Sequence, residues 1–268
     1  MGALPVCIVL DTETATLRSP HHLLELGAVR LEGGVVRERF ESLVLPRVPI
    51  DPAASLVHGL LAEDVAGAPG AGEVLARFSD WCGGAHFLVA HNAPFDAAVL
   101  GFECGRCGIA LPELAFLDTL RLARRAFPKA RNHKLGTLAA ELGLEHERAH
   151  RALDDALACA GLLLACVERL GGEECERRGR SRVRARAAPP EYLPTHLAGL
   201  PLACLERRPL VLEYGLDDEH ERVALPVLPI QLYRKSRSDY LEARCGRSGA
   251  WKTYRLDRVH ALHALERG

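Results

Sequence analysis

A short apolar stretch that runs directly into two acidic residues constrains this chain more than any other feature. The residues from Val6 to Leu10 are mostly β-branched or long aliphatic, which is typical of a strand buried on both faces. Asp11 and Glu13 follow at once, and the alternation of side chains along a strand places both carboxylates on one face. Two carboxylates this close repel each other unless a cation lies between them. The stretch therefore predicts either a site for a hard metal ion or a strand end with solvated acids.

Two further segments combine an imidazole and a carboxylate near the start of a predicted helix. The first reads His91-Asn-Ala-Pro-Phe-Asp96 after a short apolar strand, and Asp96 falls in the first turn of a helix expected from about Phe95 to Cys107. The second reads His150-Arg-Ala-Leu-Asp-Asp155. A spacing of five does not place two side chains on the same helix face. We therefore expect His150 in the loop before a helix and Asp155 in its first turns, from where both reach one site.

The order of the predicted elements indicates a layered α/β domain. A hairpin with a glycine turn at Gly33-Gly34 follows the first strand, and strands then alternate with helices over about the first 170 residues. This order is typical of helices packed on a mixed sheet.

Composition limits the partners and the compartment that we expect. The formal net charge of the 268 residues is -1, so any nucleic-acid contact must come from a local basic patch. The 9 cysteines follow no signal-peptide pattern, and we expect reduced thiols in a cytoplasmic protein. No apolar run is long enough to span a bilayer, so a membrane partner is not expected.

Together the three acidic segments resemble the DEDDh 3′→5′ exonucleases, the family of the proofreading subunit of bacterial DNA polymerase III and the T-type ribonuclease. The likeness rests on Asp11-Thr-Glu13-Thr and on the two segments that end at Asp96 and Asp155, which match in order and spacing and lie within residues 1–172. The resemblance implies an RNase H-like mixed sheet flanked by helices. It also implies hydrolysis of DNA or RNA from a free 3′ end, with release of nucleoside 5′-monophosphates.

The same resemblance implies two divalent cations, Mg²⁺ or Mn²⁺, about 3.5–4 Å apart. Asp11 would bridge both ions, Glu13 and Asp155 would complete the site of the ion that activates water, and Asp96 would hold the second ion. His150 would take the proton from the attacking water, a role that suits an imidazole. Four residues are implied at the substrate: Thr12, Thr14, His58 and Phe95.

Composition changes after Leu170. Six arginines between positions 177 and 186 precede Pro189-Pro190, so residues 173–195 are predicted to form an exposed linker. This linker is either a solvated charged hinge or an arm that steers nucleic acid. Residues 196–268 contain short strands separated by polar turns, which is typical of a small barrel or sandwich.

This C-terminal part resembles a WYL domain through the segments 206–214, 222–226, 239–241 and 254–259. The resemblance implies a small Sm-like β-barrel that binds nucleic acid or a small anionic effector. Arginine forks pair well with phosphate, and the alternative is that these arginines form surface salt bridges with nearby acids. The candidate residues for anion binding are Arg222, Arg255 and Arg258.

Three functions are compatible with these features. The first is a metal-dependent exonuclease with an appended regulatory or nucleic-acid-binding domain. The second is a non-catalytic sensor of nucleic acid or of an effector, and the third is a transcription regulator built around the WYL-like part. The presence of all four acids and of His150 favours the enzyme, and the lack of a recognisable helix-turn-helix weighs against the regulator.

Overall fold

The computed structural model describes residues 4–18, 20–216 and 221–265. The chain divides into two compact units, residues 1–186 and residues 187–268, and each is described by itself.

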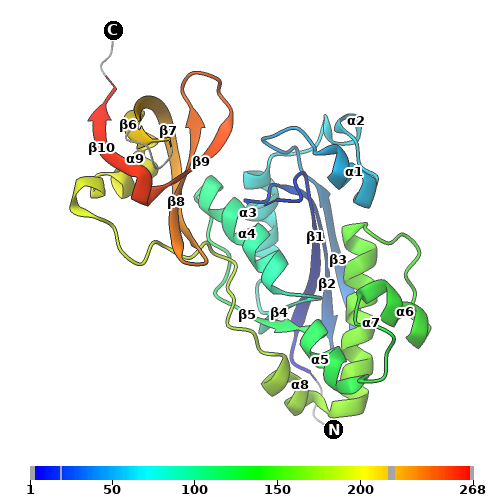
Figure 1. Cartoon of the computed structure of the whole chain (residues 1–268). Coiled ribbons are helices and arrows are strands. Elements are labelled where there is room, and N and C mark those ends of the chain that lie inside the picture. Colours follow the sequence, from blue (N-terminus) through cyan, green and yellow to red (C-terminus); the bar gives the residue numbers. More distant parts are fainter. Residues whose placement is uncertain (1–3, 19, 217–220, 266–268) are drawn as a thin grey trace. The chain divides into compact units, whose positions relative to one another are not determined.

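The first unit is built on a mixed sheet of five strands in the order β3-β2-β1-β4-β5 (Figure 1). The strands are β1 (Cys7–Thr14), β2 (Leu23–Glu32), β3 (Val35–Leu43), β4 (Phe87–Ala90) and β5 (Ala115–Asp118). β1 is antiparallel to β2 and parallel to β4, and β4 is parallel to β5. The predicted mixed sheet is thus confirmed, but β1 extends through the acidic residues instead of ending before them.

The hairpin of β2 and β3 turns at Gly33 and Gly34, as predicted. Both glycines have positive φ, 56° and 81°, which is the backbone conformation of a two-residue type I′ turn. Glycine adopts this conformation without the steric cost that a Cβ would bring.

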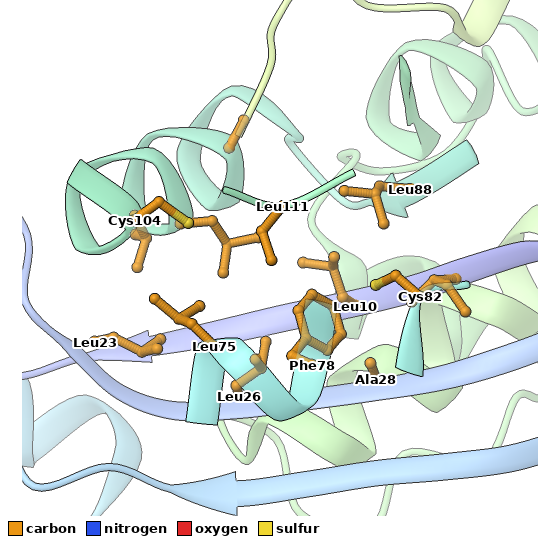
Figure 2. Packing of buried hydrophobic residues seen from close by; sticks show 14 of the residues in the cluster. Leu10, Leu23, Leu26, Ala28, Leu75, Phe78, Cys82, Leu88, Cys104 and Leu111 are labelled. Carbon is orange, nitrogen blue, oxygen red and sulfur yellow. The ribbon is translucent and has the colours of Figure 1, made fainter. Parts of the chain in front are cut away.

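Helices cover both faces of this sheet. The helices α3 (Ala71–Trp81) and α4 (Pro94–Cys107) pack on one face, where Leu10 and Phe78 belong to one buried cluster (Figure 2). The helices α5 (Thr119–Ala126) and α7 (Ala152–Leu170) pack on the other face, in a second cluster that contains Val9. Consecutive residues of β1 therefore point to different helical layers, as the alternation of a strand requires.

Shorter helices complete the first unit: α1 (Pro52–His58), α2 (Ala62–Val65), α6 (Leu135–Leu142) and α8 (Gly172–Gly179). The position of α8 corrects the first part of the predicted linker, residues 173–186. Cys175 and Gly179, four residues apart, are buried on one face of α8, while Arg177 and Arg178 pair with Glu174. The first two arginines of the run therefore belong to a packed helix and not to a free hinge.

The chain after α8 continues along the edge of the sheet. Arg180 forms an antiparallel bridge with Leu117 of β5, and the amide of Ser181 donates to the carbonyl of Phe116 at 2.7 Å. Val183 and Ala185 then pack against the buried cluster under α3 and α4. Residues 173–186 are thus part of the first unit.

The second unit is an antiparallel sheet of five strands in the order β10-β6-β7-β8-β9. The strands are β6 (Leu210–Gly215), β7 (Arg222–Lys235), β8 (Ser238–Cys245), β9 (Trp251–Arg255) and β10 (Val259–Ala264), and the helix before them is α9 (Leu200–Glu206). Four of these strands are predicted from the sequence. β10 is not, because His260 and His263 interrupt its apolar pattern. Closure of this sheet into a barrel remains a prediction.

The nine cysteines are all free thiols. No helix within the described ranges is both long enough and apolar enough to cross a membrane.

Candidate active site

The candidate site begins on β1, where successive side chains point alternately to the two faces of the sheet. Asp11 and Glu13 lie in phase with Val9, which packs on the side of α7. Thr12 has the opposite phase, and its Oγ1 hydroxyl donates to Oδ1 of Asp96 at 2.8 Å. The sequence predicts Thr12 as a substrate contact, whereas in the structure it is buried and holds another predicted site residue.

Asp96 reaches the site from the first turn of α4, as predicted. Pro94 occupies an N-terminal position of this helix, where its missing N–H leaves no bond unmade. Asn92 takes a left-handed conformation with φ of 71°, and its amide donates to Oδ1 of Asp118 at 3.1 Å. This turn directs the chain from β4 into α4 and so brings the buried carboxylate of Asp96 to β1.

The N-terminus of α7 contributes the remaining predicted residues. Asp155 lies in the first turn of α7, and His150 lies in the loop before it with φ of 65°. Glu13, His150 and Asp155 each offer one ligand atom, and these atoms all lie within 4.8 Å of one another. The structure therefore brings together side chains from two segments that are about 140 residues apart in the sequence.

Burial and neighbouring charges raise the pKa of three carboxylates of this site. Burial raises the pKa of Asp11 well above its ordinary value, and the charges of Asp96, Asp155 and Glu13 raise it further. Burial, followed by the charge of Asp155, raises the pKa of Glu13 to about 8. Burial also raises the pKa of Asp96 to about 7, although the hydrogen bond from Thr12 opposes this change.

This donor set suits a divalent cation. Carboxylate oxygens are the ligands that Mg²⁺ and Mn²⁺ prefer, and the mutual repulsion shows that the acids carry more negative charge than the site itself compensates. The positive charge of Arg151 lowers the pKa of Glu13 and so acts against this rise. A bound cation would relieve the repulsion that these pKa values record.

One residue of the site escapes the sequence analysis. The Nε2 atom of His146 is in hydrogen-bond contact with Oδ1 of Asp155, and the imidazole of His146 lies against Gly136 of α6. Asp155 thus has an imidazole at His146 as well as the nearby one at His150. The sequence gives no signal for this contact, because His146 lies in a loop nine residues before Asp155 and outside any helical or strand periodicity.

The other predicted substrate residues lie around this site in different environments. Thr14 is buried, and its hydroxyl donates to the carbonyl of Thr16 at 2.9 Å. Phe95 is partly buried and lies 4.9 Å from the ring of His21.

His58 is another predicted substrate residue, and it is buried. It ends α1, and its Nδ1 accepts a hydrogen bond from the amide of Leu60 at 3.0 Å. Burial lowers the pKa of His58, which favours a neutral ring with the proton on Nε2. A backbone hydrogen bond with Thr14 acts to raise the pKa of this ring.

The three arginines predicted to bind anions in the second unit all have protein acceptors. Arg222 pairs with Glu213 at 2.8 Å, Arg255 contacts Asp257 with its Nε at 3.0 Å, and Arg258 donates to the carbonyl of Leu216 at 2.9 Å. The salt bridges at Arg222 and Arg255 agree with the alternative considered for these residues.

Comparison with known proteins places this geometry in a family. The chain matches the family model described as Exonuclease over residues 8–163 and the model described as WYL domain over residues 195–264. It is 35% identical over 162 residues to DNA polymerase III PolC-type of Bacillus cereus. That match covers 60% of this chain and 11% of the polymerase, so the chain spans about a ninth of the length of this relative.

Solved structures agree with this placement. Exonuclease X in complex with 5′ overhanging duplex DNA has a TM-score of 0.51 and 26% identity, over 65% of this chain and 99% of its own. The nuclease domain of 3′hExo, a DEDDh family member bound to rAMP, has a TM-score of 0.56 and 17% identity, over 67% of this chain and 98% of its own. Because the exonuclease match extends over more than half of its residues, the chain belongs to the exonuclease family, and its C-terminal part matches a WYL domain.

Proposed function

We propose that the protein is a 3′→5′ exonuclease that hydrolyses DNA or RNA with two divalent cations, Mg²⁺ or Mn²⁺, and releases nucleoside 5′-monophosphates. Membership of the exonuclease family supports nuclease activity and a requirement for divalent metal ions. The observation that carries the finer proposal is the convergence of Asp11, Glu13, Asp96, Asp155 and His150 from three separate segments.

The acids hold the metal ions in this proposal. Asp11 lies among the other three acids, whose charges all raise its pKa, and this central position suits a carboxylate shared by two ions. Glu13 and Asp155 would complete one ion site, and Asp96 would complete the other. When bound, the two ions activate the attacking water and stabilise the leaving 3′-oxygen.

The histidines have separate tasks. His150 is exposed beside Glu13 and Asp155, so its imidazole can accept the proton of the attacking water. His58 is proposed to orient a nucleotide, as the family resemblance implies, from its buried position at the end of α1.

The WYL domain is proposed to add affinity for nucleic acid or to bind a small anionic effector. Its exposed arginine–acid pairs are not an obstacle, because salt bridges at the surface are weak and can exchange with phosphate. The family resemblance supports a regulatory or binding role for this domain in place of a chemical one.

End-labelled DNA and RNA oligonucleotides, incubated with Mg²⁺, with Mn²⁺ or with EDTA, test the proposal. We expect metal-dependent shortening from the 3′ end, with nucleoside 5′-monophosphates as products. A blocked 3′ end should prevent digestion, whereas a blocked 5′ end should not. Rapid cutting of circular single strands would contradict the proposed direction and would indicate an endonuclease.

A further inference from the structure

A fully buried carboxylate on β2 connects the sheet to the N-terminus of α7. Glu25 lies opposite Glu13 in the register of β1 and β2, and its exposed fraction is 0%. It accepts hydrogen bonds from Nε of Arg151 at 3.1 and 3.2 Å, from Nη2 of Arg151 at 2.7 Å and from the amide of Ala152 at 3.0 Å. These donors belong to the N-cap residue and the first residue of α7, 126 and 127 positions further along the chain.

Glu25 takes the place of an ordinary helix cap. Arg151 is the N-cap residue of α7, and its side chain makes no capping hydrogen bond. The carboxylate of Glu25 instead satisfies the amide of Ala152, at the helix end where the macrodipole favours negative charge. The cap of α7 therefore comes from the strand beside the acids and not from the helix itself.

The helix start is also held against the strand by direct backbone contact. A Cβ at Gly27 of β2 would lie 2.1 Å from the backbone nitrogen of Leu153, so no side chain fits there. Arg151 is in turn connected to two residues of the candidate site. The amide of Asp155 donates to the carbonyl of Arg151 at 3.0 Å, and His150 directly precedes Arg151 in the chain. A shift of Arg151 would therefore move both His150 and Asp155 relative to Glu13.

We propose that Glu25 is a positioning residue, which through Arg151 and the cap of α7 sets the distance of His150 and Asp155 from the acids of β1. This inference rests on the proposed function. Glu25 would touch neither substrate nor metal, because its carboxylate is already occupied by Arg151 and Ala152. Replacement of a residue that orients a metal ligand without touching the metal typically lowers metal affinity or activity by about 10–100-fold.

The first experiment compares Glu25→Gln and Arg151→Lys with Arg148→Ala. Glu25→Gln keeps an oxygen for the amide of Ala152 and loses the charge pair, whereas Arg151→Lys keeps the charge and loses the two-nitrogen fork. Arg148 is a matched control in the same loop, since it pairs with Asp154 and its side chain is 59% exposed. We expect Glu25→Gln to lower kcat and Mn²⁺ affinity by about 10–100-fold with KM within about threefold. Arg151→Lys should be intermediate, and Arg148→Ala should match the wild type.

The second experiment separates positioning from helix capping. Glu25→Ala removes the cap, and adding Arg151→Ser supplies a local one, because serine is a preferred N-cap residue. If Glu25 sets the position of α7, the double variant regains thermal stability but not kcat or Mn²⁺ affinity. If Glu25→Ala does not fold by itself, Glu25→Gln and Arg151→Lys still decide the question.

Two outcomes would overturn the inference. One is a double variant with wild-type kcat and Mn²⁺ affinity, since Glu25 would then act only as a cap. The other is wild-type kcat and Mn²⁺ affinity in Glu25→Gln. A wild-type protein that hydrolyses no 3′ end would instead contradict the proposed function, and Mn²⁺ binding measured by calorimetry would still test the role of Glu25.

Discussion

The hydroxyl of Thr12 donates a hydrogen bond to the carboxylate of Asp96 across 2.8 Å and thereby joins β1 to the first turn of α4. Both residues are buried, and a hydrogen bond to a charged group in such a place is typically worth about 1.5–3 kcal/mol. This hydrogen bond lowers the pKa of Asp96 and so opposes the effect of burial. Thr12 therefore holds the carboxylate of Asp96, in addition to the substrate contact that is predicted for it.

Replacement of Thr12 by valine should change the pH dependence of hydrolysis. Without the donor, the pKa of Asp96 rises above its present value of about 7, so the acid holds its proton at neutral pH and binds a cation less well. We expect kcat at pH 7 to fall about 10-fold, because the ionised form of Asp96 loses about 1.4 kcal/mol of stabilisation. Activity should recover in part at pH 9. Thr14→Val is the control, because Thr14 donates to a carbonyl, and its pH optimum should not change.

Asp11→Asn should abolish hydrolysis and stabilise the metal-free protein. The raised pKa values of Asp11, Glu13 and Asp96 mean that the folded state keeps protons that the unfolded chain releases. The free energy of unfolding therefore falls as pH rises from about 4 to about 8. Asp11→Asn removes one of the repelling charges, so thermal unfolding in EDTA at pH 8 should show a gain of about 1–3 kcal/mol. An identical pH dependence in wild type and variant would contradict the assigned repulsion.

The two histidines beside Asp155 should differ in their effect on rate. His150→Asn should lower kcat about 10²–10⁴-fold, the usual contribution of a general base. Asparagine is the chosen replacement because it tolerates the left-handed conformation that His150 adopts. His146→Asn should cost about 10-fold or less, because His146 packs against Gly136 and orients the acid. A larger loss at His146 than at His150 would transfer the role of base to His146.

Truncation should locate the end of the catalytic unit. We expect a fragment of residues 1–186 to fold and to cleave short oligonucleotides. A fragment ending at Gly172 loses buried Cys175 and the contact of Gly179 with Leu122. It should lose about 2–4 kcal/mol of unfolding free energy, the scale of one or two buried apolar side chains. Denaturant unfolding of the two fragments measures the difference, and equal stability would place the boundary at the earlier position.

The arginines of the WYL domain should affect binding and not chemistry. Arg222→Ala, Arg255→Ala and Arg258→Ala should each weaken binding to long single strands and reduce the salt dependence by about 0.7 in logarithmic slope. Turnover of dinucleotides should stay unchanged. Arg208→Ala is the control, since Arg208 forms a similar exposed pair with Glu206. If Arg222→Ala, Arg255→Ala and Arg258→Ala all bind long strands as the wild type does, the domain serves a small ligand or a protein partner instead.

Local signals in the sequence explain why so much of the site could be predicted. The alternation of β1 places Asp11 and Glu13 together, Pro94 marks the start of α4, and a spacing of five separates His150 from the helix of Asp155. Each of these signals spans a few residues, and the strands and helices that they predict are present. Their convergence depends on the sheet order, which the family resemblance supplied.

Contacts between distant segments could not be predicted in this way. The pair of Glu25 and Arg151 joins positions 126 residues apart, and neither residue stands out in composition. The contact of His146 depends on the path of an irregular loop. The arginine-rich segment misleads for a physical reason, because its first arginines lie on a helix whose buried residues, Gly172, Cys175 and Gly179, are small and give no strong apolar pattern.

The antiparallel bridge between Arg180 and Leu117 has a consequence for self-association. An uncovered outer strand offers unpaired amides and carbonyls to any other extended chain, which is a common route to aggregation. Here Arg180 and Ser181 occupy part of that edge of β5, so the protein's own backbone takes the place that a foreign strand would fill.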